Sequence, residues 1–415
     1  MNYIKQYAGL PRQVYVICLS RMILGFSSMS FTISTLLLRS ILGLPENIIG
    51  YIVSGQAILA VLASMLGGRL ADLYGRKRIT ISMFAMVVIS CFASSVLCRS
   101  RWVIPFLFIT NFFSSAAYPG IAGMLADAMK GTGRREGFSL LYLCSNLGIA
   151  IGPAIGGMLF YNHLPWVYRL QGIIICFAMA FFAAFTKDNY DPSIARAKKD
   201  LEDKASGENT ESVFKVVLAR PVLMRFYLSL IVITICYQMV NFILSMQMTD
   251  IFGLEIASVF AGRVWSANGI TILLLSPIVV AHFKHMHQYK KMVLGVCFYA
   301  IGFGGYAWLK TPWMVPALAV VWTVGEILIT TDSGGFIAEN SPPSHLARCQ
   351  SLFETSRSLG RVISPTLFGH LLSYINYSQA WHINSIICIC VGIFLWFSYK
   401  NLVVKAQPDA QPAAK

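Results

Sequence analysis

GGRLADLYGRKRIT, residues 67–80, separates two long apolar segments and is the most informative short stretch of the chain. We expect one helix to end within it and the next to begin. Gly68 would let two helices approach closely, and Gly75 would permit a tight turn. Asp72 would lie at a helix end, where it can accept hydrogen bonds from a neighbouring helix amino terminus. Three basic residues complete the loop: Arg76, Lys77 and Arg78.

The two flanking segments belong to a series of apolar stretches. Of the 415 residues, 56% are hydrophobic and 12% are charged, about half the charged share of a soluble domain. A helix needs roughly 20 mainly apolar residues to cross a bilayer. At that length the sequence predicts twelve helices, with eleven or thirteen as alternatives, centred near residues 23, 58, 88, 116, 150, 177, 235, 271, 299, 325, 360 and 391. We therefore predict an all-α membrane protein with 12 transmembrane helices in two six-helix bundles.

A long hydrophilic segment interrupts the series between Lys187 and Arg220. It carries charges of both signs, which is typical of a linker between domains. Four parts follow: an amino-terminal six-helix bundle (1–186), a cytoplasmic linker (187–219), a carboxy-terminal six-helix bundle (220–403) and a cytoplasmic tail (404–415). The middle of the linker could form an amphipathic helix on the membrane or a solvated loop.

The basic residues predict the orientation. The formal net charge is +15, and the Lys and Arg residues lie mostly between apolar stretches. With both termini inside, 23 of the 33 fall on the cytoplasmic side and five outside. Because cytoplasmic loops are enriched in Lys and Arg, we expect both termini in the cytoplasm and the chain in the cell membrane.

The two halves contain a repeat. Residues 123–157 align without a gap with residues 335–369, at a constant offset of 212. Asp127 meets Glu339, Pro153 meets Pro365, and Gly148 meets Gly360. Repeated halves place a substrate path at their interface, which is exposed alternately to the two sides.

The spacing G-x-x-x-D-x-x-G-R-K-R in residues 68–78 resembles the signature loop of the major facilitator superfamily. The resemblance implies that Asp72 and its basic neighbours form a charge lock on the cytoplasmic face, closing the outward-open state, and that Asp127 joins it. The loop in the second half, VVAHFKHMHQYKKMV, is degenerate, with Lys284 where Asp72 would fall. Its histidines could bind a metal, but a solvated basic loop is the interpretation we favour, and no metal site is predicted.

The predicted fifth span contains NLGIAIGPAIGG, residues 146–157. Glycines at every fourth position make a stripe for close helix contact, and the proline bends the helix. The pattern G-x-x-x-G-P-x-x-G-G resembles the motif of proton-coupled antiporters in the bacterial 12-span drug:proton group, which favours efflux. The residues concerned are Gly148, Gly152, Pro153, Gly156 and Gly157.

Ionisable groups within spans are costly, so they are usually paired or functional. Glu354, Arg357 and Arg361 share one helix face, and we expect an ion-pair cluster with Glu326 or Asp332 as partner, either static or functional. Glu326 is the candidate for protonation. Drug exporters of the family often have an arginine in the fourth span, where this chain has Asn111. The candidate coupling or substrate residues are Arg21, Asn111, Arg263, Glu326, Asp332, Glu354, Arg357 and Arg361.

These features predict a secondary exporter of amphipathic small molecules, driven by proton entry in antiport. Uptake or exchange of an organic anion is the alternative, because the spans contain four arginines but only three acidic residues. A sensor that moves nothing is a third class. The sequence contains no P-loop, no nucleophile elbow and no H-E-x-x-H, so we expect no enzyme activity and no cofactor beyond a proton gradient. The expected partners are a small-molecule substrate and the lipid bilayer, without nucleic acid, and a monomer suffices.

Overall fold

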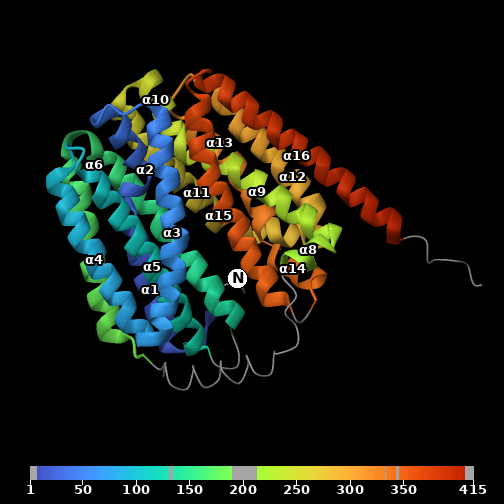
Figure 1. The fold of residues 1–415 in the computed structure, drawn as a ribbon, viewed down its shortest axis with the longest axis horizontal. Coiled ribbons are helices and arrows are strands. Elements are labelled where there is room, and N and C mark those ends of the chain that lie inside the picture. The colour runs from blue at the N-terminus through green and yellow to red at the C-terminus, as the bar shows by residue number, and fades with distance from the viewer. Residues whose placement is uncertain (1–6, 130–133, 189–212, 332, 343–344, 407–415) are drawn as a thin grey trace, which may run out of the picture. The chain divides into compact units, whose positions relative to one another are not determined.

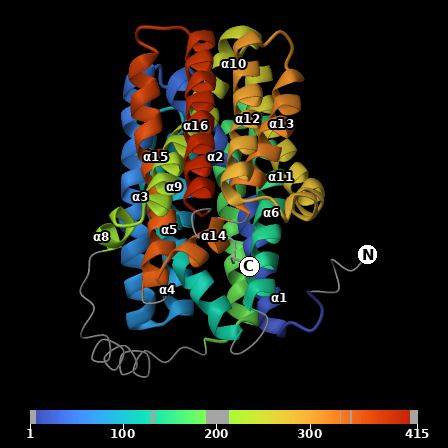
Figure 2. The same cartoon turned by 90° about the vertical axis from the view of Figure 1, so that its right-hand side faces the viewer.

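The computed structural model describes residues 7–129, 134–188, 213–331, 333–342 and 345–406. This part of the chain is helical and contains no β-strand (Figures 1 and 2). Eight helical segments in it are long and apolar enough to cross a membrane: Arg12–Ile41, Glu46–Tyr74, Arg76–Leu97, Glu136–Phe185, Pro221–Phe252, Leu254–Phe283, Met314–Asn340 and Tyr377–Lys400. A multi-span helical membrane protein follows, while the number twelve stays a prediction.

The chain divides into two compact units. Unit 1 comprises the described part of Met1–Asn209 together with Ser245–Leu273. It contains a segment that follows the predicted linker in the sequence. Its helices are α1 (Arg12–Phe26), α2 (Met29–Leu36), the π-helix η2 (Leu37–Ile41), α3 (Glu46–Tyr74), α4 (Arg76–Leu97), α5 (Val103–Ala128), α6 (Arg134–Phe185), nearly all of α10 (Leu244–Phe252) and most of α11 (Leu254–Phe283).

Helix α6 is 52 residues long and contains both the fifth and the sixth predicted spans. The two parts meet at His163, whose φ of −132° and ψ of 39° are not helical. Pro165 follows two residues later. Because proline suits the first turn of a helix, it fits the start of the second part, and the two parts are joined by a bend instead of a loop.

Unit 2 comprises the described part of Thr210–Leu244 and of Leu274–Lys415. Its helices are α8 (Val213–Leu218), α9 (Pro221–Phe242), the end of α11, α12 (Gln288–Gly305), the 3₁₀-helix η3 (Tyr306–Trp308), α13 (Met314–Thr330), α14 (Ser333–Asn340), α15 (Leu346–Leu371) and α16 (Tyr377–Ala406). Helices α12 and α16 run side by side (Figure 1).

The outer faces of both units are apolar. Val96 of α4, Phe177 of α6 and Ile301 of α12 keep 78%, 63% and 64% of their surface accessible. In water, so many large exposed apolar side chains would favour aggregation, whereas in a bilayer they contact lipid tails. The interior of unit 1 contains a cluster of buried residues from α1, α4, α5 and α6, among them Ile17, Leu24, Phe84, Val87, Ile121, Leu125, Ile175 and Phe182.

Candidate functional site

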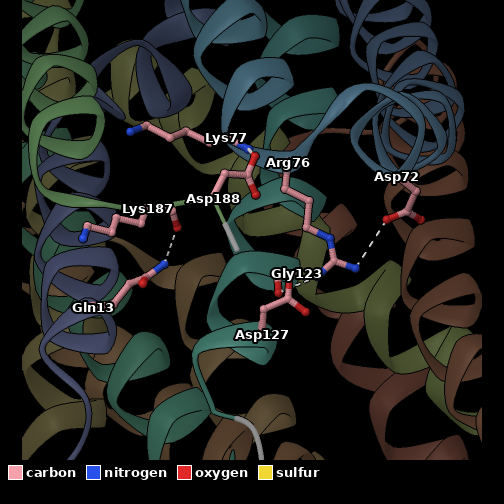
Figure 3. Close-up of polar contacts among 8 residues, drawn as sticks. All are labelled: Gln13, Asp72, Arg76, Lys77, Gly123, Asp127, Lys187 and Asp188. Atoms are coloured by element: carbon pink, nitrogen blue, oxygen red, sulfur yellow. Dashed lines mark hydrogen bonds and ion pairs between the residues drawn. The ribbon is translucent and has the colours of Figure 1, made fainter. Parts of the chain in front are cut away.

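The turn between α3 and α4 contains a network centred on Arg76 (Figure 3). Gly75 has a φ of 100°, a conformation that glycine adopts without strain, and it joins the two helices directly. Arg76 Nη1 donates to Asp127 Oδ2 at 2.6 Å and to the Gly123 carbonyl at 2.7 Å, both on α5. Its Nη2 lies 3.3 Å from Asp72 Oδ1 on α3. One guanidinium therefore joins three helices.

Glycines on α5 make room for this arginine. A Cβ on Gly123 would lie 2.8–2.9 Å from the Arg76 side chain, and one on Gly120 would lie 2.2 Å from Thr80 Oγ1. The close approach of α3 to α5 is at Gly67, where a Cβ would meet the Ala116 carbonyl oxygen at 2.0 Å. At Gly68, where we expected the approach, a Cβ would make an ordinary 3.7 Å contact with Pro119. The glycine that the packing requires is thus one residue earlier.

Lys77 and Asp188 connect the start of α4 to the end of α6 (Figure 3). Lys77 Nζ donates to the carbonyls of Ala183 and Thr186, each at 2.7 Å. Asp188 Oδ2 accepts from the Lys77 backbone N–H at 2.9 Å. A cation thus lies at a helix carboxyl end and an anion at a helix amino end, as the helix dipoles favour. The Arg78 side chain is exposed, so the three basic residues of the loop have different roles.

The glycine stripe of α6 packs against α1 and α2. A Cβ on Gly148 would lie 2.3 Å from the Met22 carbonyl oxygen, and one on Gly152 2.6 Å from that of Phe26. On Gly156 it would lie 2.5 Å from the Met29 carbonyl oxygen. These backbones approach too closely for any larger residue.

The other side of the same helix segment packs against α11. A Cβ on Gly157 would meet the Ser258 carbonyl oxygen at 2.2 Å. In return, a Cβ on Gly262 would meet the Pro153 carbonyl oxygen at 2.3 Å, and one on Gly269 the Ala150 Cβ at 2.6 Å. The glycines of α11 and Gly25 of α1 were not predicted, because they form no four-residue stripe in the sequence.

A second ionic cluster, which the sequence analysis also missed, surrounds Arg39 in the π-helix η2. Its guanidinium forms two bonds with Asp250 of α10, at 2.8 and 2.9 Å. Arg39 Nε lies 3.1 Å from Glu46 Oε1, at the start of α3. Because the 29 residues of α3 span about 43 Å, this cluster and the Arg76 network lie at opposite ends of unit 1.

The interior cations of unit 1 contact aromatic rings. The Arg21 guanidinium lies 4.0 Å from the centroid of Tyr118, and within the described residues it has no carboxylate partner. Arg263 lies 4.5 Å from the Phe260 ring. Asn111 Oδ1 is buried and accepts no hydrogen bond from any described residue.

In unit 2, Glu326 Oε1 accepts from the Tyr237 hydroxyl at 3.4 Å. The Tyr237 ring packs edge-to-face on Trp322, with 5.6 Å between centroids. Trp322 is fully buried. This carboxyl group therefore lies beside an aromatic cluster.

The charged residues of α15 make contacts within their own helix. Arg357 pairs with Glu354 at 3.6 Å, and Arg361 donates to Ser358 at 3.1 Å. Residues three and four apart on one helix reach each other in this way. The predicted participation of Glu326 or Asp332 stays a prediction. Asp332 lies outside the described residues.

The α11–α12 loop contains His287, which caps α12 by accepting from the Tyr289 N–H through Nδ1 at 3.2 Å. Its ring stacks on Tyr289 and lies 5.3 Å from that of Tyr399. Partial burial lowers the pKa of His287 and Lys290 adds to this, while Glu339 opposes it. No group of three metal-ligating side chains occurs among the described residues.

Multiple apolar spans, glycine-mediated helix contacts and ionic clusters at helix ends define a class, the multi-span helical membrane proteins. Residues 17–331 match the family model of the Major Facilitator Superfamily. The match covers most of the chain, so the chain belongs to this superfamily. The protein is therefore a secondary membrane transporter and not an enzyme. The family match confirms the resemblance noted in residues 68–78.

Similar proteins include an Na(+), Li(+), K(+)/H(+) antiporter of Planococcus maritimus, 20% identical over 77% of this chain and 80% of the relative. A homolog of the multi-drug resistance efflux pump PmrA from Lactococcus lactis is 20% identical over 86% of each chain. Among solved structures, a POT peptide transporter with alafosfalin has a TM-score of 0.76 at 16% identity, covering 94% of this chain and 95% of that one. A D-xylose-proton symporter has a TM-score of 0.72 at 12% identity, covering 92% and 96%. At these identities the structural likeness concerns the fold alone.

Proposed function

We propose that this transporter exports amphipathic small molecules from the cytoplasm in exchange for protons. The observation that supports it best is the glycine-lined α6 segment, packed against α1 and α2 on one side and α11 on the other. The pattern resembles that of antiporters, and the relatives named as an antiporter and as an efflux pump agree with it. The direction of transport rests on these two arguments together.

Transport would proceed by alternating access between two six-helix bundles of the cell membrane, with twelve spans and both termini in the cytoplasm. The positive-inside distribution of Lys and Arg supports this orientation. The Arg76 network then lies at the cytoplasmic end and the Arg39 cluster at the outer end. Arg39 and Asp250 come from the two predicted bundles, so their bidentate pair would stabilise the state that is closed to the outside. A monomer contains all of these parts.

Glu326 is the proposed proton site. Its carboxylate accepts a hydrogen bond from the Tyr237 hydroxyl, beside the buried Trp322 ring. An ionisable group within a span is usually paired or functional, so protonation and release of Glu326 would accompany its exposure to the two sides. Protonation would couple substrate exit to proton entry without a cofactor.

We expect Glu326→Gln to abolish proton-linked transport, with proton flux at least about tenfold lower, while expression and melting temperature stay normal. The measurement uses full-length protein in proteoliposomes that contain a pH-sensitive dye, to which an amphipathic cation such as ethidium is added. Glu354→Gln is the matched control, because this carboxylate is mostly exposed and pairs within its own helix. Unchanged proton flux in Glu326→Gln would remove this residue from the mechanism.

Uptake or exchange of an organic anion is the second candidate. Arg21 in unit 1 and Arg361 in unit 2 both lie within helices, and neither has a carboxylate partner among the described residues. An anionic substrate could supply the missing charge to either. The same proteoliposomes separate the candidates: anion-driven flux that Arg21→Gln abolishes, without any ethidium response in the unaltered protein, supports the second.

A further inference from the structure

The apolar surface of unit 2 is hollowed between α12 and α16. The groove has a volume of about 330 Å³. Five of its lining residues have hydrocarbon side chains: Val293, Val296, Ile389, Ile393 and Phe397. The others are Cys297, Cys388, Gly392 and Trp396. Several of these side chains are more than half exposed, including Ile389, Ile393 and Phe397. The groove follows ten residues of α16, from Cys388 to Phe397, which is about 14 Å of helix.

Two lysines extend the lining of this groove at one end. On α12, Lys290, Val293 and Cys297 are spaced i, i+3 and i+7, so they share one helix face. On α16, Ile393, Trp396 and Lys400 are spaced in the same way. Because the Lys290 Nζ lies 4.8 Å from the Tyr399 ring, the start of α12 is beside the end of α16. Both ammonium groups therefore lie at the same end of the groove.

These lysines contact rings and not acids. Lys400 Nζ lies 5.6 Å from the Trp396 ring, and the Trp396 and Tyr399 rings are 6.2 Å apart. Neither lysine has a carboxylate partner within the described residues. Tryptophan, tyrosine and lysine together at a helix end are typical of the membrane–water boundary. The cluster of Lys290, Trp396, Tyr399 and Lys400 thus combines two positive charges with an amphipathic aromatic surface.

We propose that this groove binds one anionic phospholipid. Its acyl chain lies between α12 and α16, and its phosphate lies beside Lys290 and Lys400. The hydrocarbon lining excludes polar ligands from the groove, whereas the two lysines favour a headgroup with net negative charge over a zwitterionic one. Each lysine near such a headgroup is expected to raise the affinity about fivefold. This inference does not depend on the direction of transport or on the proton site.

The test is native mass spectrometry of the full-length protein in detergent, titrated with phosphatidylglycerol or with phosphatidylcholine of the same acyl chains. We expect the anionic lipid to bind more tightly, and Lys290→Gln with Lys400→Gln to remove at least about fivefold of that preference. Lys310→Gln is the matched control, because Lys310 lies beyond the other end of α12. Equal binding of the two lipids, or a preference that the double variant retains, overturns the proposal.

Two further arms separate the acyl chain from the headgroup. Cys297 is exposed and lines the groove, so Cys297→Phe fills it from the lipid side without disturbing the interior. We expect this variant to bind phosphatidylglycerol at least about fivefold more weakly, and inorganic phosphate in excess not to displace the lipid from the unaltered protein. Competition by inorganic phosphate, or unchanged binding by Cys297→Phe at a normal melting temperature, would place the lipid elsewhere.

Discussion

The loops α3–α4 and α11–α12 occupy equivalent positions in the sequence repeat, and they are built from opposite chemistry. At the offset of 212, Gly75 corresponds to His287 and Arg76 to Gln288. The first loop contains a partly buried guanidinium between two carboxylates. The second contains a histidine among aromatic rings, and the first residue of its helix is a neutral amide.

The first residue of the helix that follows each loop nevertheless has the same role, because it connects that helix to another one. Arg76 reaches across to α5, and Gln288 Nε2 reaches the Ile329 carbonyl on α13 at 3.1 Å. Gln288 also lies 3.3 Å from Ser333 Oγ. A repeat can therefore conserve a connection between two helices while losing the charge in it. The strength of an ion pair depends on solvent exposure and on nearby charges more than the strength of a neutral hydrogen bond does. The Arg76 loop is therefore the better candidate for gating.

Removing Arg76 is expected to have the largest effect. Arg76→Ala leaves Asp127 without its closest partner, whereas Gln288→Ala removes only neutral hydrogen bonds. We expect a cost of about 2–3 kcal/mol for the arginine, about 1 kcal/mol for the glutamine, and at least about tenfold slower transport for the arginine variant. Thermal unfolding in detergent measures the loss of stability, and flux in proteoliposomes measures the transport rate. Arg78→Ala, at an exposed side chain, is the control, and an equal loss in the Gln288 variant would show that charge is unimportant.

Replacing Gly75 comes next. Its φ of 100° disfavours any residue with a Cβ, and that Cβ would also lie 3.3 Å from Asp188 Oδ2. We expect Gly75→Ala to lower stability by about 1–2 kcal/mol and to weaken the contact between α4 and Asp188. The position of His287 has a φ of −59°, so His287→Ala should cost only its cap, about 1 kcal/mol. Melting temperatures of the two variants in one detergent check the order, and the reverse order would contradict it.

Much of the first loop could be predicted from the sequence. Asp72, Gly75 and Arg76 lie within one short motif, and local spacing is enough to bring them together. Asp127 followed from the resemblance to the family. The Arg39–Asp250 pair could not be predicted, because its members are 211 residues apart and neither lies in a motif.

The glycine contacts show the same limit. The stripe from Gly148 to Gly156 was visible as a periodic pattern, but a stripe does not reveal which helix packs on it. Gly25 is a single glycine in α1, and Gly262 and Gly269 of α11 are seven residues apart, so their role follows from backbone distances alone. The ion pair of Arg357 with Glu354 could be predicted, because local spacing places the two residues on one helix face, whereas a partner on another helix stays a prediction.

The smallest expected effect concerns pH and the second loop. Burial lowers the pKa of His287 below its usual value, with Lys290 acting in the same direction and Glu339 against it. At pH values between the folded and the unfolded pKa of this histidine, the unfolded chain binds more protons than the folded one. The contribution of His287 to stability is therefore fully present above about pH 6.5 and declines as the pH falls below it. His287→Asn retains a capping oxygen and removes the titration. Melting temperatures at pH 7.5 and 5.5 should therefore differ less in this variant than in the unaltered protein. An identical pH dependence in the two proteins would show that the pKa of His287 is the same in the folded and the unfolded chain, which would contradict the prediction.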